Sequence, residues 1–185
     1  RMALRHGIPK ELRTIVAVPT LLTSRQGIDE QVERLEVHYL ANADDDLRFA
    51  LLSDWRDAPS DSVPDDAELL AVAVEGIALL NKRYGPASGG GSRFVLFHRR
   101  RVWNESEQVW MGWERKRGKL HELNQFLRGS TSTTFMSVGG QLPEAIPSVR
   151  FVITLDADTR LPRGAAHRLI GTMAHPLNRA RFDPL

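Results

Sequence analysis

The sequence predicts an α/β fold built on an open, largely parallel sheet that is flanked by helices. Short apolar runs rich in β-branched and aromatic residues alternate along the chain with segments of helical periodicity. Such alternation requires crossover connections, which place successive strands parallel to one another. Several of the apolar runs are followed directly by polar residues, as expected where the carboxyl ends of parallel strands form a ligand-binding edge.

Four strands are expected, each as a short apolar run. The first, RTIVAVP, is rich in β-branched residues and closed by Pro19, so we expect it to end there. The second and third are LRFALLS and RFVLFH, and the fourth, VRFVITL, runs up to a pair of aspartates. The expected strands cover residues 13–19, 47–53, 93–98 and 149–155.

Four helices are expected from apolar side chains at steps of three and four residues. The first has Asp29 near its start, and the second opens at Pro64 and ends at Gly85. The third stops at Gly129, and loops rich in Gly, Ser and Pro are expected over 88–92 and 130–147. The expected helices cover residues 29–40, 64–84, 120–127 and 165–173.

Composition excludes several classes of protein. The 185 residues are 42% hydrophobic and 26% charged, as in an ordinary globular domain. The absence of cysteine excludes disulfides and thiolate metal sites, and a net charge of +2 is too small for the whole surface to attract nucleic acid or membrane. No run approaches the ~18 apolar residues of a membrane-spanning helix. Because the chain begins at Arg1 and stops at Leu185 with no closing element, we expect a piece of a longer polypeptide.

Asp156 and Asp158, directly after the fourth expected strand, are the strongest candidates for a metal site. Two carboxylates two positions apart at a strand end can converge on one hard cation such as Mg²⁺ or Mn²⁺. Such a cation neutralises a diphosphate and stabilises it as a leaving group. Asp44 and Asp46 share the spacing, but they lie between a helix and a strand, where we expect a solvated turn. We therefore interpret Asp156 and Asp158 as metal ligands rather than as capping or turn residues.

Other polar residues are expected at the same edge of the sheet. Asp54, just beyond the second strand, can accept hydrogen bonds from a uracil ring or from ribose hydroxyls, with a loop or turn aspartate as the alternative. Lys119 lies at the predicted start of the third helix. A helix N-terminus favours the binding of a diphosphate, and the charge of Lys119 would add to that effect. The alternative is that Lys119 is a surface lysine without a ligand. The remaining candidates at strand ends are Pro19, Thr20, His98 and Arg99.

Residues 93–119 combine positive charge with aromatic side chains. They hold eight Lys or Arg residues against three glutamates, together with Trp103, Trp110 and Trp113. This mixture is compatible with sugar stacking, a phosphate funnel, an interfacial membrane contact or single-stranded nucleic acid. The simpler alternative is an insertion that packs its tryptophans on the domain and exposes its arginines.

Beyond these local patterns, the chain strongly resembles a known family. The succession RTIVAVPTLLTS, FALLSDW, WMGWERKRGKLHELN and FVITLDADTRLPRG resembles the glycosyltransferase region of bacterial cyclic β-1,2-glucan synthases along nearly the whole chain. More distantly, the arrangement is similar to processive GT-A transferases of the cellulose-synthase kind. The resemblance implies a GT-A, Rossmann-like fold, with residues 1–12 as a linker or pre-domain segment and 13–185 as its nucleotide-sugar-binding half.

The resemblance also implies a function. The donor would be UDP-glucose, bound with Mg²⁺ or Mn²⁺, for inverting transfer to a growing β-1,2-glucan. Inversion requires a carboxylate base, which in such enzymes lies on the acceptor half. We therefore expect the acceptor half and the base to lie beyond the C-terminus of this chain. We also expect the isolated chain to be inactive. The whole synthase would be membrane-embedded, with this segment at the cytoplasmic face of the bacterial inner membrane. The resemblance implies Asp54, Lys119, Asn124 and Asp156 as nucleotide-sugar-binding residues and Asp156 and Asp158 as metal ligands. Pro19 and Thr20 complete the predicted nucleotide-sugar site because of their place at a strand end.

Three other functions are compatible with parts of the sequence. A haloacid-dehalogenase-type phosphotransferase also uses Asp-x-Asp after a strand, but its motif normally has Thr or Val where this chain has Arg160. The dehalogenase motif also lies on the first strand of its core domain, whereas here three expected strands precede it. A non-catalytic interaction domain could keep half of the fold without turnover. Nucleic-acid binding through residues 93–119 conflicts with the near-neutral net charge, so we expect no nucleic-acid partner.

Overall fold

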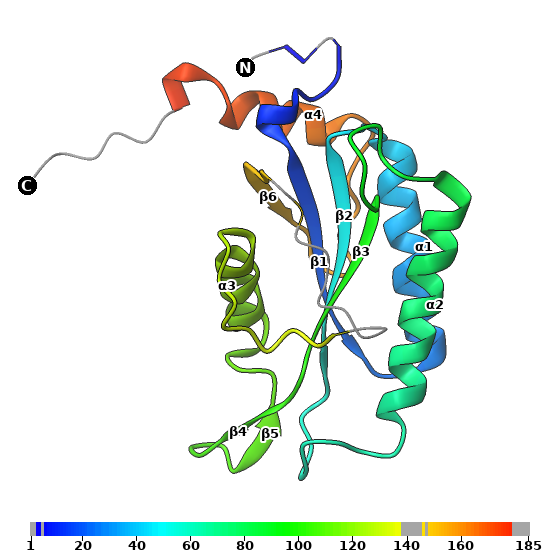
Figure 1. The fold of residues 1–185 in the computed structure, drawn as a ribbon, viewed down its shortest axis with the longest axis vertical. Helices are drawn as coiled ribbons and strands as arrows, with labels where there is room; N and C mark the ends of the chain where they lie inside the picture. Colours follow the sequence, from blue (N-terminus) through cyan, green and yellow to red (C-terminus); the bar gives the residue numbers. More distant parts are fainter. Residues whose placement is uncertain (1–2, 5, 138–145, 147, 179–185) are drawn as a thin grey trace, which may run out of the picture.

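The computed structural model describes residues 3–4, 6–137, 146 and 148–178. Within them a four-stranded parallel sheet carries helices on both faces, a Rossmann-like α/β arrangement that confirms the predicted fold class (Figure 1). The strand order is β3-β2-β1-β6. The strands are β1 (Thr14–Leu22), β2 (Leu47–Trp55), β3 (Phe94–Arg99) and β6 (Phe151–Thr154).

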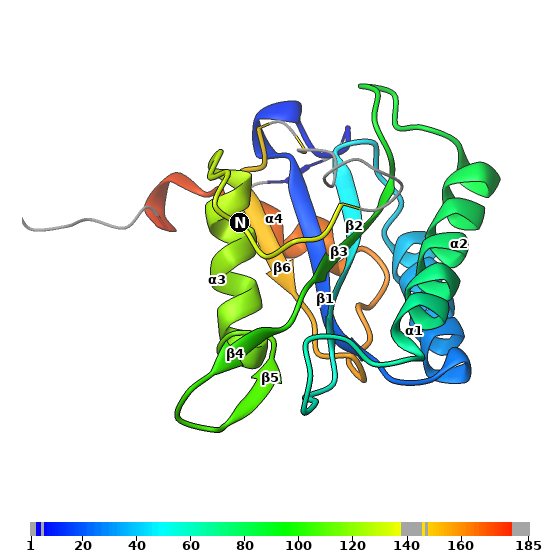
Figure 2. The ribbon, with the colours of Figure 1, turned by 60° about the horizontal axis from the view of Figure 1, so that its bottom comes forward.

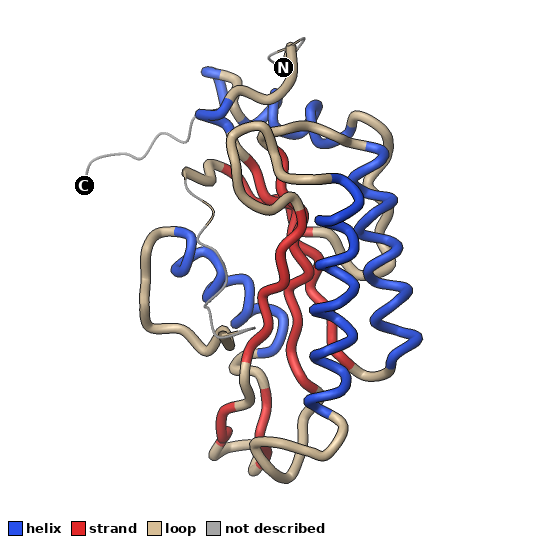
Figure 3. The backbone as a smooth tube through the Cα atoms, turned by 45° about the vertical axis from the view of Figure 1, so that its right-hand side comes forward, coloured by secondary structure: helices blue, strands red, loops and turns tan. Residues whose placement is uncertain are grey.

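The helices form two layers around the sheet. On one face, α1 (Arg25–Ala41) and α2 (Asp66–Tyr84) lie side by side, and α4 (Ala165–Met173) contributes Ala166 and Ile170 to the same core. The opposite face carries α3 (Arg115–Leu127) (Figures 2 and 3). Two short 3₁₀ turns, η1 (Lys10–Leu12) and η2 (Pro176–Asn178), lie near the two ends of the described chain.

The central strand β2 is buried along its whole length, which explains why its sequence is an almost continuous apolar run. Its side chains alternate between the two cores: Phe49 and Leu51 pack with α1 and α2, and Ala50 and Leu52 pack on the side of α3. Full burial of a side chain such as Phe49 stabilises the fold by about 1.5–3 kcal/mol. The sheet therefore gives the polar residues at its carboxyl edge a rigid support.

The prediction that β1 ends at Pro19 is wrong, because the strand continues to Leu22. The carbonyl of Ala17 accepts a hydrogen bond from the chain that follows β6, and Pro19, two residues further along the strand, points its backbone to the same side. β6 pairs with β1 only as far as Ala17. Pro19 therefore occupies a position where no ladder hydrogen bond needs its missing N–H, which is where a strand tolerates proline.

Two helices begin earlier than predicted. Ser24 caps α1 by accepting a hydrogen bond of 3.1 Å from the backbone N–H of Gly27, so the helix starts at Arg25 rather than at Asp29. α3 starts at Arg115 rather than at Leu120, and Lys119 consequently lies in its second turn instead of at its N-terminus. The other two helices, α2 and α4, match the predicted ranges closely.

A hairpin between β3 and α3 was not predicted. It consists of β4 (Val102–Asn104) and β5 (Val109–Met111), which pair antiparallel and project from the carboxyl end of the sheet (Figure 1). Backbone hydrogen bonds in both directions between Trp110 and Ala58 tie the hairpin to the loop after β2. Each strand has three residues, which is too short to show a clear alternation in the sequence.

Parts of the expected loop over 130–147 lie outside the described residues, as do the C-terminal residues 179–185. Its described part, residues 130–137, crosses beside β3, where Phe135 makes an isolated bridge with Arg99. Among the described residues, no helix combines the length and apolar character needed to span a membrane.

Candidate functional site

A cleft of ≈ 670 Å³ lies at the carboxyl ends of β1 and β2 and beside the start of α3. This is the edge of the sheet where the sequence predicted polar residues to collect. Pro19, Thr20, Asp54 and Lys119 all line the cleft, as does Ala157 between the two aspartates of the expected metal site. The structure therefore brings most of the predicted site residues together, while their roles stay predictions.

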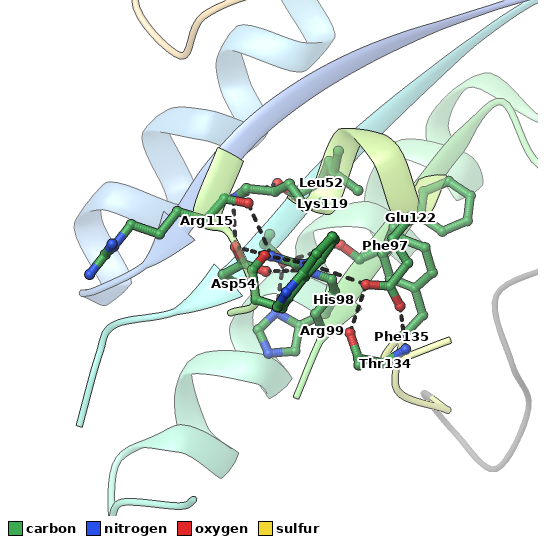
Figure 4. Close-up of polar contacts among 12 residues, drawn as sticks. Leu52, Asp54, Phe97, His98, Arg99, Arg115, Lys119, Glu122, Thr134 and Phe135 are labelled. Carbon is green, nitrogen blue, oxygen red and sulfur yellow. Dashed lines mark hydrogen bonds and ion pairs between the residues drawn. The ribbon is translucent and has the colours of Figure 1, made fainter. Parts of the chain in front are cut away.

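Asp54 lies within β2 rather than beyond it, and its side chain is buried. In the register of the sheet it stands between Leu21 on β1 and Arg99 on β3. The guanidinium of Arg99 donates to both carboxylate oxygens, with Nε 2.8 Å from Oδ1 and Nη2 3.0 Å from Oδ2 (Figure 4). The Nζ of Lys119 lies 3.2 Å from Oδ2 as well. Three of the roughly four acceptor positions of the Asp54 carboxylate are thus used inside the protein, which leaves about one for a nucleoside.

Lys119 points into the protein and not out of a helix terminus. Its Nζ donates to the carbonyl oxygen of Thr20 at 2.7 Å and lies 3.2 Å from Oδ2 of Asp54. Burial lowers the pKa of Lys119, against the opposing influence of the Asp54 carboxylate. Lys119 is 3% exposed and joins β1 to β2 and α3 at the wall of the cleft. This buried position corrects the expectation of a lysine at a helix N-terminus.

The exposed lysine of the cleft is Lys116, one turn before Lys119, which the sequence reasoning missed. Its Nζ forms an ion pair with Oδ1 of Asp156, and both side chains are more than half exposed. A signal was available in the sequence, because the spacing of three places Lys116 and Lys119 on one face of a helix. Arg115 also lines the cleft and pairs with Asp57 at 2.9 Å.

Asp156 and Asp158 leave β6 in a turn and expose their carboxylates. Two carboxylates offer only hard oxygen donors, the ligands that Mg²⁺ and Mn²⁺ prefer, although Oδ1 of Asp156 is paired with the ammonium of Lys116 here. Mg²⁺ or Mn²⁺ at this pair would have to displace the ammonium of Lys116 and to take further ligands from outside the pair. No group of three or more His, Asp or Glu side chains suited to a metal occurs among the described residues.

Asn124 does not join this cleft. It is exposed on α3 and lines two other hollows, beside residues such as Arg128 and Leu127. Lys119 and Asn124 are five residues apart, which separates them by about 140° around a helix. The expectation that both face the same donor phosphates is therefore not met in this arrangement.

The structure of segment 93–119 differs from the simpler alternative, in which its tryptophans pack on the domain and its arginines are exposed. Arg99 and Arg101 are buried, with 0% and 4% exposure, whereas Trp103 and Trp113 are 42% and 48% exposed. Arg101 forms a two-pronged ion pair with Asp66 at 2.5 and 3.1 Å. The arginines of this segment are thus partly structural, and two of its tryptophans face solvent.

The second aspartate cluster is a turn, as expected, but it is not simply solvated. Asp44 is half-buried and accepts hydrogen bonds of 2.9 Å from the backbone N–H of Ile8 and from Asp46. It also contacts Nε2 of His167 on α4 at 2.9 Å. This turn fastens the N-terminal segment and α4 to the amino edge of the sheet, which accounts for its acidic residues without a ligand.

Comparison with known proteins identifies one curated relative. No family model matches the chain. Over 178 residues the chain is 52% identical to the cyclic beta-(1,2)-glucan synthase NdvB of Rhizobium meliloti (strain 1021). The match covers 96% of this chain but 6% of the length of NdvB. The chain is therefore similar to one short segment of a cyclic β-(1,2)-glucan synthase, which confirms the family resemblance seen in its sequence.

Proposed function

We propose that this chain is the nucleotide-sugar-binding part of a GT-A glycosyltransferase that uses UDP-glucose to extend a β-1,2-glucan. The carrying observation is the cleft at the carboxyl ends of β1 and β2, which is lined by Arg115, Lys116 and Ala157, with Asp156 paired to Lys116 beside it. The similarity to a segment of NdvB supports the same activity. A dehalogenase-type active site would require its Asp-x-Asp on the first strand of the core, and here the motif follows β6, at the edge of the described sheet.

In this proposal each side chain has a defined part. Lys116 and Arg115, both exposed at the cleft, attract the diphosphate of the donor. Asp54 contributes its one remaining acceptor position to the nucleoside, and buried Lys119 keeps that carboxylate in place. Asp156 and Asp158 would hold Mg²⁺ or Mn²⁺, which when bound neutralises the charge that develops on the departing diphosphate. We assign no catalytic base to this chain.

We further propose that the segment acts within a larger membrane-embedded synthase, at its cytoplasmic face. There the remainder of the synthase would supply the acceptor glucan, the catalytic base and the exit route for the product. The small share of NdvB that the chain matches supports this division of labour.

Calorimetric titration of UDP into the full-length protein, with and without Mg²⁺ or Mn²⁺, tests the proposal. We expect binding that depends on the cation and that Asp158→Asn abolishes. Loss of an outer-shell partner already costs about 10- to 100-fold in metal affinity, so loss of a ligand carboxylate should cost at least as much.

Asp29→Asn is the matched control, because Asp29 is also exposed but lies on α1, outside the turn that follows β6. It is expected to leave UDP binding unchanged. Binding of UDP that is equally tight without the cation, or no binding to the folded full-length protein, would refute the assignment. Hydrolysis of a generic phosphomonoester would instead favour a phosphotransferase, and salt-sensitive binding of a single-stranded oligonucleotide would favour a nucleic-acid module.

A further inference from the structure

We propose that Arg99 is a positioning residue of the donor cleft, which holds the carboxylate of Asp54 and the start of α3 in one fixed arrangement. The inference rests on the proposed function, since it assigns Arg99 a role in binding the nucleotide sugar. Arg99 itself is 0% exposed and reaches the cleft only through the groups that it holds.

All five N–H groups of the guanidinium have acceptors within the protein. Nε and one N–H of Nη2 donate to Asp54 at 2.8 and 3.0 Å. Nη1 donates to Oε2 of Glu122 at 3.2 Å and to the carbonyl oxygen of Trp113 at 3.1 Å, and Nη2 donates to the carbonyl oxygen of Arg115 at 3.1 Å. One side chain thus joins β2, the turn before α3 and α3 itself (Figure 4).

The turn that Arg99 holds determines where the cations of the cleft lie. Glu114 and Arg115 have φ angles of 50° and 45°, in the left-handed region that side chains other than glycine rarely adopt. The carbonyl groups on either side of Glu114 are those that Arg99 binds. Lys116 follows this turn directly, so its approach to the cleft depends on the turn keeping its unusual conformation.

The space around the Asp54–Arg99 pair is closed on the side of the cleft by Gly112. A Cβ atom at Gly112 would come within 2.7 Å of Oδ2 of Asp54 and 2.9 Å of Nη2 of Arg99. The pair therefore packs against bare backbone, with no room for an alternative rotamer on that side. Charge is also balanced in this cluster, because Arg99 and Lys119 face Asp54 and Glu122.

Lysine cannot replace arginine in this position without loss, since an ammonium has three donors in place of a planar fork of five. In full-length Arg99→Lys we expect the affinity for UDP, measured with Mg²⁺ present, to fall about tenfold or more. The control is Arg48→Lys: Arg48 is 3% exposed and donates to backbone carbonyls, but it lies at the opposite end of β2 from Asp54. Thermal unfolding of both variants separates a loss of stability from a loss of binding.

The proposal predicts that both variants lower the melting temperature and that Arg99→Lys alone weakens UDP binding. It is overturned if the two variants bind UDP equally well. Wild-type protein that binds no UDP would refute the proposed function itself, so the two failures are distinguishable.

Glu122→Gln provides a second variant should Arg99→Lys fail to fold. Glu122 contacts Arg99 from the side away from the donor cleft and lies in a different hollow. The amide keeps the shape of the side chain but replaces an acceptor oxygen with a donor, which weakens the hydrogen bonds that Glu122 accepts from Arg99, Thr133 and Thr134. We therefore expect a lower melting temperature and, in the folded variant, a two- to fivefold loss of UDP affinity, on the order of 0.4–1 kcal/mol. Unchanged affinity in this variant would overturn the proposal.

Discussion

Lowering the pH from 7.5 to 5 is expected to destabilise the fold by about 2 kcal/mol through one histidine, His98. His98 lies on β3 with 0% exposure and stacks edge-on against Trp55, with ring centroids 4.2 Å apart. Its Nδ1 is 2.8 Å from the hydroxyl oxygen of Ser53, whereas Nε2 has no hydrogen-bond partner among the described residues. A proton added at Nε2 would therefore be buried without an acceptor.

The direction of the effect follows from the pKa of His98 in the two states. Burial lowers this pKa in the folded protein from 6.5 to about 4, against a smaller opposing effect of Asp54. The unfolded chain takes up a proton near pH 6.5 and the folded chain only near pH 4, so the stabilisation is complete above pH 6.5 and is lost as the pH falls between these values. Each pH unit in that window costs about 1.4 kcal/mol.

Urea unfolding at pH 7.5, 6 and 5 measures the effect in wild type and in His98→Gln. We expect the variant to lose clearly less stability than wild type between pH 7.5 and 5. Burial also lowers the pKa of His38, so a part of the pH dependence is expected to persist in the variant. His121→Gln, at an exposed position on α3, is the control. The same loss in wild type and His98→Gln would exclude His98 as the source.

The sequence was sufficient for the fold class because the sheet is central and its strands are apolar along their length. β2 and α4 show this well, since their buried residues have the periodicity of the elements that they form. Pro19 could not be placed in the same way. Whether a proline interrupts a strand depends on where the neighbouring strand ends, and the end of β6 lies more than 130 residues further along the chain.

The candidate site was predictable to the level of the sheet edge but not to the level of side-chain partners. The position of Asp54 near the carboxyl end of β2 follows from its place after an apolar run. Its partnership with Arg99 depends on which strands are neighbours and on their register, and neither can be derived from local sequence. Once the helix is known to begin at Arg115, the periodicity of 3.6 residues separates Asn124 from Lys119.

Gly118 shows how far a single residue can control the start of α3, and with it the cations of the cleft. A Cβ atom at this position would come 1.9 Å from the carbonyl oxygen of Trp113 and 2.8 Å from Cβ of Glu114. The predicted third helix begins only at Leu120, yet Gly118 lies inside α3, where it allows the helix to pack directly against the preceding turn.

Gly118→Ala is expected to destabilise the protein by about 2 kcal/mol or more. Overpacking against rigid groups costs about 1–3 kcal/mol, and occasionally more. The obstacle here is a backbone carbonyl that also accepts a hydrogen bond from Arg99, so the turn cannot move aside without losing that contact. Alanine has a helix propensity about 1 kcal/mol more favourable than that of glycine. An overpacking cost at the upper end of the range of about 1–3 kcal/mol exceeds this gain. The corresponding fall in melting temperature is about 4–8 °C for a chain of this size.

Gly76→Ala is the matched control, because Gly76 also lies inside a helix and gains the same propensity. A Cβ atom there would come 2.9 and 3.3 Å from the two methyl groups of Val32, so it meets a side chain on α1 and not a backbone carbonyl, and the gain in helix propensity offsets part of the crowding. We expect Gly76→Ala to change stability by less than about 1 kcal/mol, well below the effect at Gly118. Equal melting temperatures for the two variants would contradict the argument. If the turn before α3 moves in Gly118→Ala, Lys116 moves with it, so we expect this variant also to bind UDP more weakly. Gly76 lies in α2 on the opposite face of the sheet, so we expect Gly76→Ala to bind UDP as the wild type does.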